Sequence, residues 1–376
     1  MRMMFAARAM DNMAGGVERM IITIMNEMVR RGHEVALFSW DHAEAEAFYP
    51  LDSKVKWYKL DLGRPATRAG LGLRLQRAPK VRRMVNDFAP DVIVGFQGGA
   101  YRALRLYTLG LGIPVAVAER NAPTLYDYVD SRRKQRIERF TYRFAKRITV
   151  QFDRFRTYYP PYLQDKIVET PNPVSAAKLM AAPDQPSADG RYRLLSVGRL
   201  SYQKNYPALI DAFGQLAAEF PQWDLHIVGE GKDRARLEAQ IASMPDLMGR
   251  VFLPGTRKDV EREYEAAQLF CLPSRWEGFP NALAEALAHG LPSVGFEGCA
   301  GVADLIENRQ TGLLAAGNED KQTLSEALRR LMDAHHQRAQ MGRAATTSMR
   351  KYRADLCFDR WEDVLLEAGE ATPKAR

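Results

Sequence analysis

The sequence has few cysteines and no long apolar run. Its three cysteines, Cys271, Cys299 and Cys357, are scattered over 376 residues. Their number and spacing exclude a disulfide framework and a cysteine zinc site, and favour a reducing, cytosolic compartment. No run of about 18 apolar residues is present, so no membrane-spanning helix is predicted. The N-terminal residues, Met1–Phe5, lead directly into a predicted strand and do not read as a signal peptide.

Two ligand-binding patterns are also missing. No two aspartates are spaced i, i+2, so the carboxylate pair that often holds a catalytic divalent ion is absent. The pair Gly15–Gly16 has no third glycine, and the Gly229–Gly231 turn has Arg234 where a dinucleotide-binding loop has glycine. We therefore expect no metal ion and no dinucleotide cofactor.

The net charge is +8, and basic residues gather in two segments of the first half. Residues 64–83 contain no acidic residue, and residues 132–147 contain Glu138 as their single acid. The members of the first segment are Arg64, Arg68, Arg74, Arg77, Lys80, Arg82 and Arg83. Such segments attract polyanions, namely a phospholipid surface, nucleic acid or phosphorylated substrates, unless they are simply solvated helix faces. No helix-turn-helix pattern, zinc spacing or aromatic RNA motif accompanies them, so nucleic acid is not an expected partner.

Short apolar strands alternate with amphipathic helices along most of the chain, which predicts an α/β protein with parallel sheets. The predicted strands are Arg2–Ala7, His33–Phe38, Asp91–Phe96, Pro114–Ala118, Leu194–Val197, Leu225–Val228, Leu269–Leu272 and Pro292–Phe296. The predicted helices are Gly16–Arg31, Pro207–Glu219, Asp233–Ser243, Asn281–His289 and Leu356–Glu370.

A proline-rich stretch, Glu169–Val174, separates two series of these elements and predicts a linker. The predicted domains are residues 1–170 and residues 171–355. The remaining segment, 356–376, contains a helix that can pack on either the first or the second domain. Two doubly wound domains that face one another would bind a ligand between the carboxyl ends of their strands.

Three loops at predicted strand ends offer groups for chemistry. Gly15 and Gly16 precede a helix whose backbone N–H groups could hold an anion, although a plain turn explains them equally well. Arg199 and Lys204 follow a strand of the second half, where they either bind phosphate or are solvated cations. The last loop contains Glu277, the turn Gly278-Phe279-Pro280-Asn281 and, one helical turn further, Glu285.

These elements together resemble the retaining glycosyltransferases of family GT4, which have the GT-B fold of two facing Rossmann-like domains with a cleft between them. The resemblance covers nearly the whole chain. It rests on Gly15–Arg19 with Arg31–Val35, on Thr170–Val174, and on the paired glutamates of Glu277–Glu285. His33 and His42 belong to a predicted strand and match no family histidine, and the segment Gly298–Ala303 departs from the usual proline-containing version.

The resemblance implies transfer of a sugar from a nucleotide-diphosphate donor to a hydroxyl, with retention and without a metal ion. Arg199 and Lys204 would then stabilise the leaving diphosphate, together with backbone N–H groups at Gly16 and near Phe279–Asn281. Glu277 would bind the donor sugar and Glu285 the ribose. A non-catalytic sugar-nucleotide-binding paralogue and a nucleotide-sugar epimerase are the alternatives.

A narrower resemblance concerns bacterial enzymes that build lipid-linked oligosaccharides, capsule or O-antigen. It rests on Phe96, Glu119-Arg120-Asn121 and Pro123. It implies a UDP-sugar donor, with GDP-mannose as the alternative, and acceptor or sugar contacts at Gln97, Glu119, Arg120 and Asn121. The basic segments 64–83 and 132–147 suggest in addition that the first domain docks on anionic lipid, so we expect a cytoplasmic enzyme that attaches peripherally to the inner face of the membrane.

Overall fold

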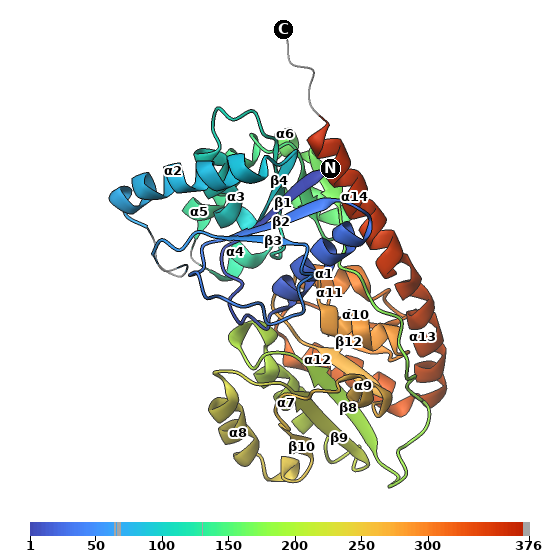
Figure 1. Ribbon diagram of the computed structural model, residues 1–376. Coiled ribbons are helices and arrows are strands. Elements are labelled where there is room, and N and C mark those ends of the chain that lie inside the picture. Colours follow the sequence, from blue (N-terminus) through green and yellow to red (C-terminus); the bar gives the residue numbers. More distant parts are fainter. Residues whose placement is uncertain (64, 66–68, 130, 371–376) are drawn as a thin grey trace. The chain divides into compact units, whose positions relative to one another are not determined.

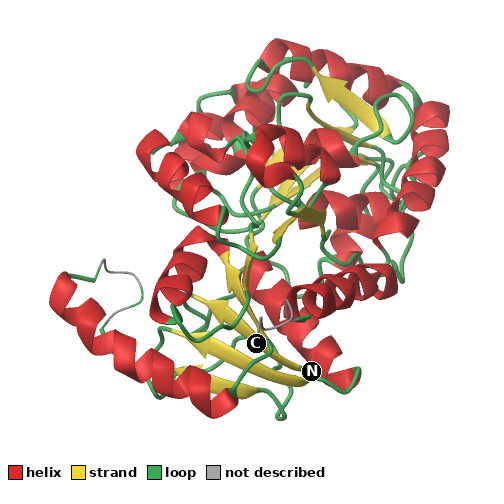
Figure 2. Cartoon of the chain, turned by 90° about the horizontal axis from the view of Figure 1, so that it is seen from above, coloured by secondary structure: helices red, strands yellow, loops and turns green. Residues whose placement is uncertain are grey.

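The computed structural model describes residues 1–63, 65, 69–129 and 131–370 of the chain, which forms two units, each built on one parallel sheet (Figures 1 and 2). The first unit comprises Met1–Asn121, Tyr126–Pro173 and the chain from Asp355 onward. The second comprises Ala122–Leu125 and Val174–Ala354. The main chain therefore enters the second unit after Pro173 and returns to the first at Asp355.

The sheet of the first unit has seven strands in the order β3-β2-β1-β4-β5-β6-β7, and all neighbouring pairs are parallel. The strands are β1 (Arg2–Ala7), β2 (Glu34–Ser39), β3 (Lys56–Lys59), β4 (Val92–Phe96), β5 (Val115–Ala118), β6 (Ile148–Val150) and β7 (Ile167–Glu169). Every residue of β4 and β5 is buried, as expected for central strands covered on both faces.

Helices flank this sheet. They are α1 (Gly16–Arg30), α2 (Leu71–Phe88), α3 (Gln97–Tyr107), α4 (Leu125–Tyr128), α5 (Arg132–Tyr142), the 3-10 turn η1 (Asp153–Tyr158), α6 (Pro161–Gln164) and α14 (Ala354–Gly369). In α1 the buried residues recur at helical spacing, for example Met20, Ile24 and Met28, so one stripe of the helix faces the core.

The sheet of the second unit has six strands in the order β10-β9-β8-β11-β12-β13, again with parallel neighbours throughout. The strands are β8 (Tyr192–Val197), β9 (Trp223–Val228), β10 (Val251–Phe252), β11 (Leu269–Leu272), β12 (Ser293–Phe296) and β13 (Gly312–Ala315). Because all strands run the same way, the loops that follow them gather at one edge of the sheet, its carboxyl edge.

The helices of the second unit are α7 (Tyr206–Gly214), α8 (Arg234–Ala242), α9 (Glu261–Glu265), α10 (Asn281–Ala288), α11 (Ala300–Leu305), α12 (Lys321–Asp333) and α13 (His335–Ser348). Its 3-10 turns are η2 (Tyr202–Lys204), η3 (Pro245–Leu247) and η4 (Met349–Tyr352). The helix predicted over Pro207–Glu219 ends earlier, at Gly214, because glycine is a poor helix former and the chain continues in turns.

Helix α14 packs on the first unit. Arg31 at the end of α1 binds Glu362 at 2.5 Å and Asp359 at 2.7 Å, and His33 lies 2.7 Å from Glu362. On the same helix, the buried Trp361 stacks on Phe96 with ring centroids 5.9 Å apart. Ion pairs and an aromatic contact together therefore tie α14 to β4 and to the end of α1.

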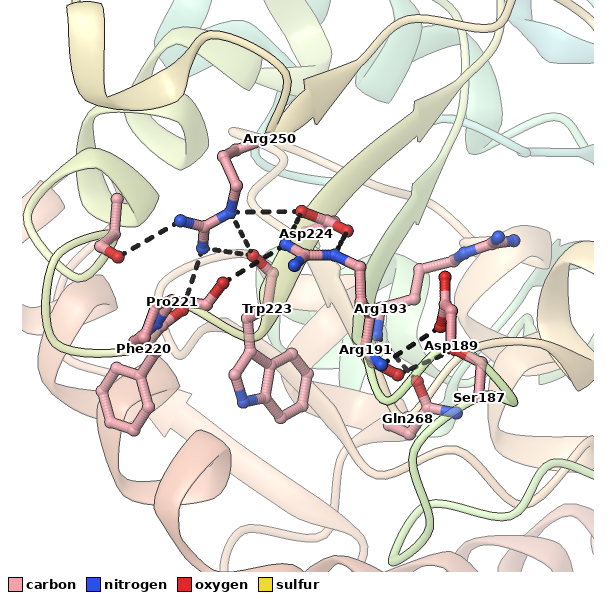
Figure 3. A network of polar contacts seen from close by, with 11 residues as sticks. Ser187, Asp189, Arg191, Arg193, Phe220, Pro221, Trp223, Asp224, Arg250 and Gln268 are labelled. Carbon is pink, nitrogen blue, oxygen red and sulfur yellow. Dashed lines mark hydrogen bonds and ion pairs between the residues drawn. The ribbon is translucent and has the colours of Figure 1, made fainter.

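The opposite, amino edge of the second sheet is held by a network of charged side chains (Figure 3). Asp224 accepts hydrogen bonds from Arg191, at 2.5 Å from Nη2, and from Arg250, at 3.2 Å from Nε. Arg250 also donates to the carbonyl of Trp223, and Gln268 accepts from the backbone N–H of Arg193 at 2.7 Å. These groups bind one another and the backbone, so the network fixes the starts of the strands.

Candidate functional site

Two loops at the carboxyl edge of the second sheet, one after β8 and one after β11, are bonded to each other. The backbone N–H of Arg275 donates to the carbonyl of Gln203 at 2.8 Å. The side-chain amide of Gln203 returns a bond to the carbonyl of Trp276 at 2.9 Å, and Arg275 donates to the carbonyl of Tyr202 at 2.5 Å. The predicted residues of both loops are therefore held in one place.

The ammonium group of Lys204 and the carboxylate of Glu277 form an ion pair between these loops. Lys204 Nζ lies 2.5 Å from Glu277 Oε1, and the two side chains are 16% and 8% exposed. Ser274 Oγ donates to the same oxygen at 2.7 Å. Gln203 Nε2 lies 3.5 Å from Oε2, at the outer limit of a hydrogen bond.

Gly198, directly after β8, allows the side chain of Lys204 to reach this position. A Cβ at Gly198 would come 3.1 Å from Lys204 Cε and 2.8 Å from the buried Tyr206 hydroxyl. A side chain at this position would therefore force Lys204 and Tyr206 to shift.

Arg199 differs from Lys204. Its side chain is exposed, and no hydrogen bond or ion pair joins its guanidinium to another residue of the described ranges. The Arg199 guanidinium is therefore available for the bidentate phosphate contact that the sequence predicts for it.

The second motif glutamate, Glu285, lies on α10, which begins at Asn281 directly after Pro280. The hydroxyl of Tyr264, on α9, donates to Glu285 Oε2 at 3.0 Å. The ring of His289 lies 4.9 Å from that of Tyr264, and its Nδ1 is 2.8 Å from the carbonyl oxygen of Glu285. The sequence predicted Glu285 as a site residue but gave no sign of Tyr264.

The turn between the two glutamates is packed into the second unit. Phe279 is buried and meets Tyr352 edge to face, with ring centroids 5.5 Å apart. Gly278 lies against α11, since a Cβ at Gly301 would collide with the Gly278 carbonyl oxygen. The segment Gly298–Ala303, which differs from the usual proline-containing version, therefore places Gly301 in the first turn of α11, directly against this turn.

In the first unit, the glycine pair Gly15–Gly16 begins α1, as predicted. A Cβ at Gly15 would collide with Glu18 Oε2, so a carboxylate of the chain itself lies against this first turn. An acid in the first turn is favourable for a helix. The role of Gly15 and Gly16 toward a donor stays a prediction.

Glu119 and its neighbours stand at the carboxyl end of β5. Glu119 is buried, its Oε2 accepts from the Tyr142 hydroxyl at 2.6 Å, and its Oε1 accepts from the backbone N–H of Asn121 at 3.1 Å. Burial raises the pKa of the Glu119 carboxyl, against the effect of the Tyr142 hydrogen bond. A second buried carboxylate, Glu138, binds the hydroxyl of Tyr126. The sequence did not point to these partners.

The side chain of Arg120 is directed into the interior of the first unit. It donates to the carbonyl of Thr170 at 2.7 Å and to the hydroxyl of Thr149 at 2.5 Å, and its guanidinium lies 5.0 Å from the ring centroid of Trp361. Burial lowers its pKa to about 9, which leaves it charged at neutral pH. These donors hold the strand ends and α14, and the acceptor contact expected for Arg120 stays a prediction. Gln97, in contrast, is exposed and has φ 62°.

The two basic segments differ in the structure. In α2, the buried Arg77 binds the carbonyl of Leu62, and Arg82 binds the carbonyl of Leu109 at 2.9 Å. Arg64 and Arg68 lie outside the described residues. In and after α5, exposed basic and apolar side chains form a basic–aromatic patch. Its members are Arg132, Arg133, Arg136, Ile137, Phe140, Arg143 and Phe144.

Within the described ranges, no cluster of histidine, cysteine or acidic side chains could hold a metal ion. No helix in these ranges has the length and apolarity to cross a membrane.

Comparison with known proteins adds two family matches that lie side by side on the chain. Residues 15–173 match the glycosyl transferase 4-like domain, and residues 181–348 match the glycosyl transferases group 1 family. The chain belongs to the GT4-like glycosyltransferases. This glycosyltransferase is therefore an enzyme, a hexosyltransferase, and the family prediction made from its glutamate and glycine motifs is confirmed.

Two relatives are similar to this chain over almost their whole length. An uncharacterized glycosyltransferase of Haemophilus influenzae is 24% identical over 94% of this chain and 96% of that protein. The GalNAc-alpha-(1->4)-GalNAc-alpha-(1->3)-diNAcBac-PP-undecaprenol alpha-1,4-N-acetyl-D-galactosaminyltransferase of Campylobacter jejuni is 25% identical over 95% of this chain and 97% of that protein.

A solved structure, Anabaena Alr3699/HepE in complex with UDP and glucose, superposes with a TM-score of 0.76 at 18% identity. The match covers 97% of this chain and 99% of that one. It confirms the GT-B fold, and at this identity it shows the fold alone.

Proposed function

We propose that this glycosyltransferase moves a sugar from a UDP-sugar to a hydroxyl of a lipid-linked glycan, with retention at the anomeric carbon and without a metal ion. The observation that supports it most is the Lys204–Glu277 pair at the carboxyl edge of the second sheet, on the loop after β8 that also carries the uncommitted Arg199. Two cations and a carboxylate there suit a diphosphate and the hydroxyls of a sugar.

In the proposed reaction, the bond between the anomeric carbon and the diphosphate oxygen breaks first. Negative charge gathers on the diphosphate, and Arg199 and Lys204 stabilise it. The acceptor oxygen then bonds to the anomeric carbon from the same face, and its proton passes to the departing phosphate oxygen. Glu277 holds the sugar hydroxyls and Glu285 the ribose, so neither glutamate acts as a nucleophile.

The donor and acceptor are inferred from the relatives. The Anabaena structure contains UDP and glucose, and the Campylobacter enzyme acts on an undecaprenol-linked glycan by its name. We assign nucleotide-sugar binding to the second unit and acceptor contacts to Gln97, Glu119 and Asn121 of the first. GDP-mannose is the alternative donor.

Transfer can be tested directly. The enzyme is incubated with UDP- and GDP-sugars and an undecaprenyl-diphosphate-linked glycan, in the presence of a chelator, and the anomeric configuration of the product is read by NMR. We expect an α-linked product from an α-linked donor, with full activity in chelator. An inverted product, loss of activity in chelator, or donor conversion without an acceptor would contradict the proposal, and the last outcome would favour an epimerase.

We further propose that the enzyme works at the inner face of the membrane and docks there through the basic–aromatic patch of α5. Exposed aromatic rings can enter the headgroup region while the arginines meet anionic lipid. Phe140 and Phe144 are 52% and 53% exposed, and the guanidinium of Arg143 lies 4.7 Å from the Phe140 ring centroid. Each basic residue near such a surface contributes on the order of 1 kcal/mol.

Vesicle sedimentation tests this docking. The wild type should pellet with anionic vesicles, remain in solution with neutral ones, and be released by high salt. The triple variant Arg132→Glu, Arg133→Glu, Arg136→Glu should stay in solution. A control with the same charge change on exposed arginines of the second unit, Arg236, Arg330 and Arg343, should still pellet. Equal pelleting of both variants would refute docking through α5.

A further inference from the structure

Each motif glutamate is bound by a buried hydroxyl from outside the motif. Ser274 Oγ donates to Glu277 Oε1 at 2.7 Å, and the serine has no exposed surface. The Tyr264 hydroxyl donates to Glu285 Oε2 at 3.0 Å, and Tyr264 is 1% exposed. Close packing holds a buried side chain in one rotamer, so both hydroxyls are fixed points for a carboxylate.

At Glu277, the bonds select one of the two carboxylate oxygens. Lys204 and Ser274 both bind Oε1, while the nearest donor to Oε2 within the described ranges is Gln203 at 3.5 Å. A carboxylate oxygen can accept two hydrogen bonds. Oε2 is thus the oxygen with capacity for a sugar hydroxyl, and Ser274 keeps the carboxylate from exchanging its oxygens.

At Glu285, the hydroxyl is held by its ring. Tyr264 packs between Phe270, at 6.0 Å between ring centroids, and His289, at 4.9 Å. These contacts involve the ring and not the hydroxyl, so a phenylalanine at this position would keep the packing and lose the bond to Glu285.

We propose that Ser274 and Tyr264 are positioning residues of the donor site. Ser274 orients Glu277 toward the donor sugar, and Tyr264 orients Glu285 toward the ribose. The inference rests on the proposed roles of the two glutamates, and it adds that each role depends on its own hydroxyl.

The two variants Ser274→Ala and Tyr264→Phe should give different profiles. Tyr264→Phe should weaken UDP binding about 5–10-fold in calorimetry and raise KM for the donor similarly, because the ribose is part of both ligands, with kcat nearly unchanged. Ser274→Ala should leave UDP affinity within about twofold and lower kcat about 10-fold, because UDP carries no sugar for Glu277 to orient. A general loss of packing would not lower UDP affinity in one variant and kcat in the other.

Matched controls lie at the amino edge of the same sheet. Tyr192→Phe removes a hydroxyl from the first residue of β8, and Ser293→Ala removes a buried one from the first residue of β12. Both should leave UDP affinity and kcat unchanged. Thermal unfolding of all four variants shows whether each is folded at the assay temperature.

Variants of the glutamates themselves, Glu277→Gln and Glu285→Gln, distinguish an error in the proposed roles of the glutamates from an error in the positioning roles of Ser274 and Tyr264. If these two do not show the sugar-against-ribose split, the proposed roles of the glutamates are wrong. If they show it while Ser274→Ala and Tyr264→Phe behave like the controls, or like each other, the positioning inference is overturned.

Discussion

Replacing Lys204 by methionine should destabilise the second unit as well as abolish transfer. Its ammonium lies 2.5 Å from the Glu277 carboxylate, and both side chains are mostly buried. At an effective dielectric constant of about 20, two charges at this separation attract by roughly 7 kcal/mol, and much of this offsets their removal from water. Loss of the lysine alone leaves a buried carboxylate and should cost about 3 kcal/mol. For a domain of this size, the midpoint of thermal unfolding should fall by roughly 6–12 °C.

A double-mutant cycle measures the pair itself. Lys204→Met, Glu277→Gln and the double variant are compared with the wild type by calorimetry. We expect the double variant to be more stable than the sum of the single losses predicts, by at least about 1.5 kcal/mol, since it leaves no unpaired charge. It should nevertheless be inactive, because both proposed donor contacts are gone.

The control is the exposed pair Arg329–Glu219 of the same unit, at 2.9 Å, whose side chains are 45% and 49% exposed. Its cycle, with Arg329→Met and Glu219→Gln, should give a coupling below about 1 kcal/mol. Losses at Lys204 and Glu277 that add within about 0.5 kcal/mol would show that the two charges do not interact in solution, and would refute the reasoning.

Two further predictions concern single residues. Arg199→Ala should lower kcat about 10²–10³-fold at saturating donor. Arg199→Lys should also be impaired, because the point charge of a lysine does not replace the bidentate guanidinium. Wild-type turnover of both variants in steady-state assays would exclude Arg199 as the group that stabilises the leaving diphosphate. Burial raises the pKa of the Glu362 carboxyl, but hydrogen bonds from His33 and Arg31 outweigh it and hold that pKa below its ordinary value of 4.5. This stabilisation is present above pH 4.5 and is lost as the pH falls through the lowered pKa of the folded state. Glu362→Gln should therefore be less stable than the wild type at pH 7, and the two should converge in thermal unfolding once the pH is below that lowered pKa. A pH-independent difference would contradict this.

The central strands could be predicted from the sequence because they are nearly continuous apolar runs. The strands β3, β6, β7, β10 and β13 were not predicted. The four residues of β3, Lys-Trp-Tyr-Lys, have charged ends, and β10 is two residues long, so neither gives a periodic signal. Their pairing depends on a neighbouring strand that is already in place.

The loops that hold Lys204 and Glu277, and the helix that carries Glu285, could be predicted from turn residues at strand ends, but the partners of these side chains could not. Tyr264 and Glu285 lie on different helices, and no spacing rule joins them. The inward course of Arg120 depends on Thr149 of β6, on Thr170 directly after β7 and on Trp361, all of them distant in the sequence. Tertiary contacts therefore decide which polar residues remain available for a ligand.

The return of the chain to the first unit at Asp355 has a consequence for synthesis on the ribosome. The sheet of the first unit is translated first, yet α14, with Trp361 stacked on Phe96, is translated only after the whole second unit. The nascent first unit therefore exposes the apolar surface that α14 later covers for as long as the second unit takes to be made. Apart from one short segment, the second unit is contiguous from Val174 to Ala354. Its main core can therefore form before α14 completes the first unit.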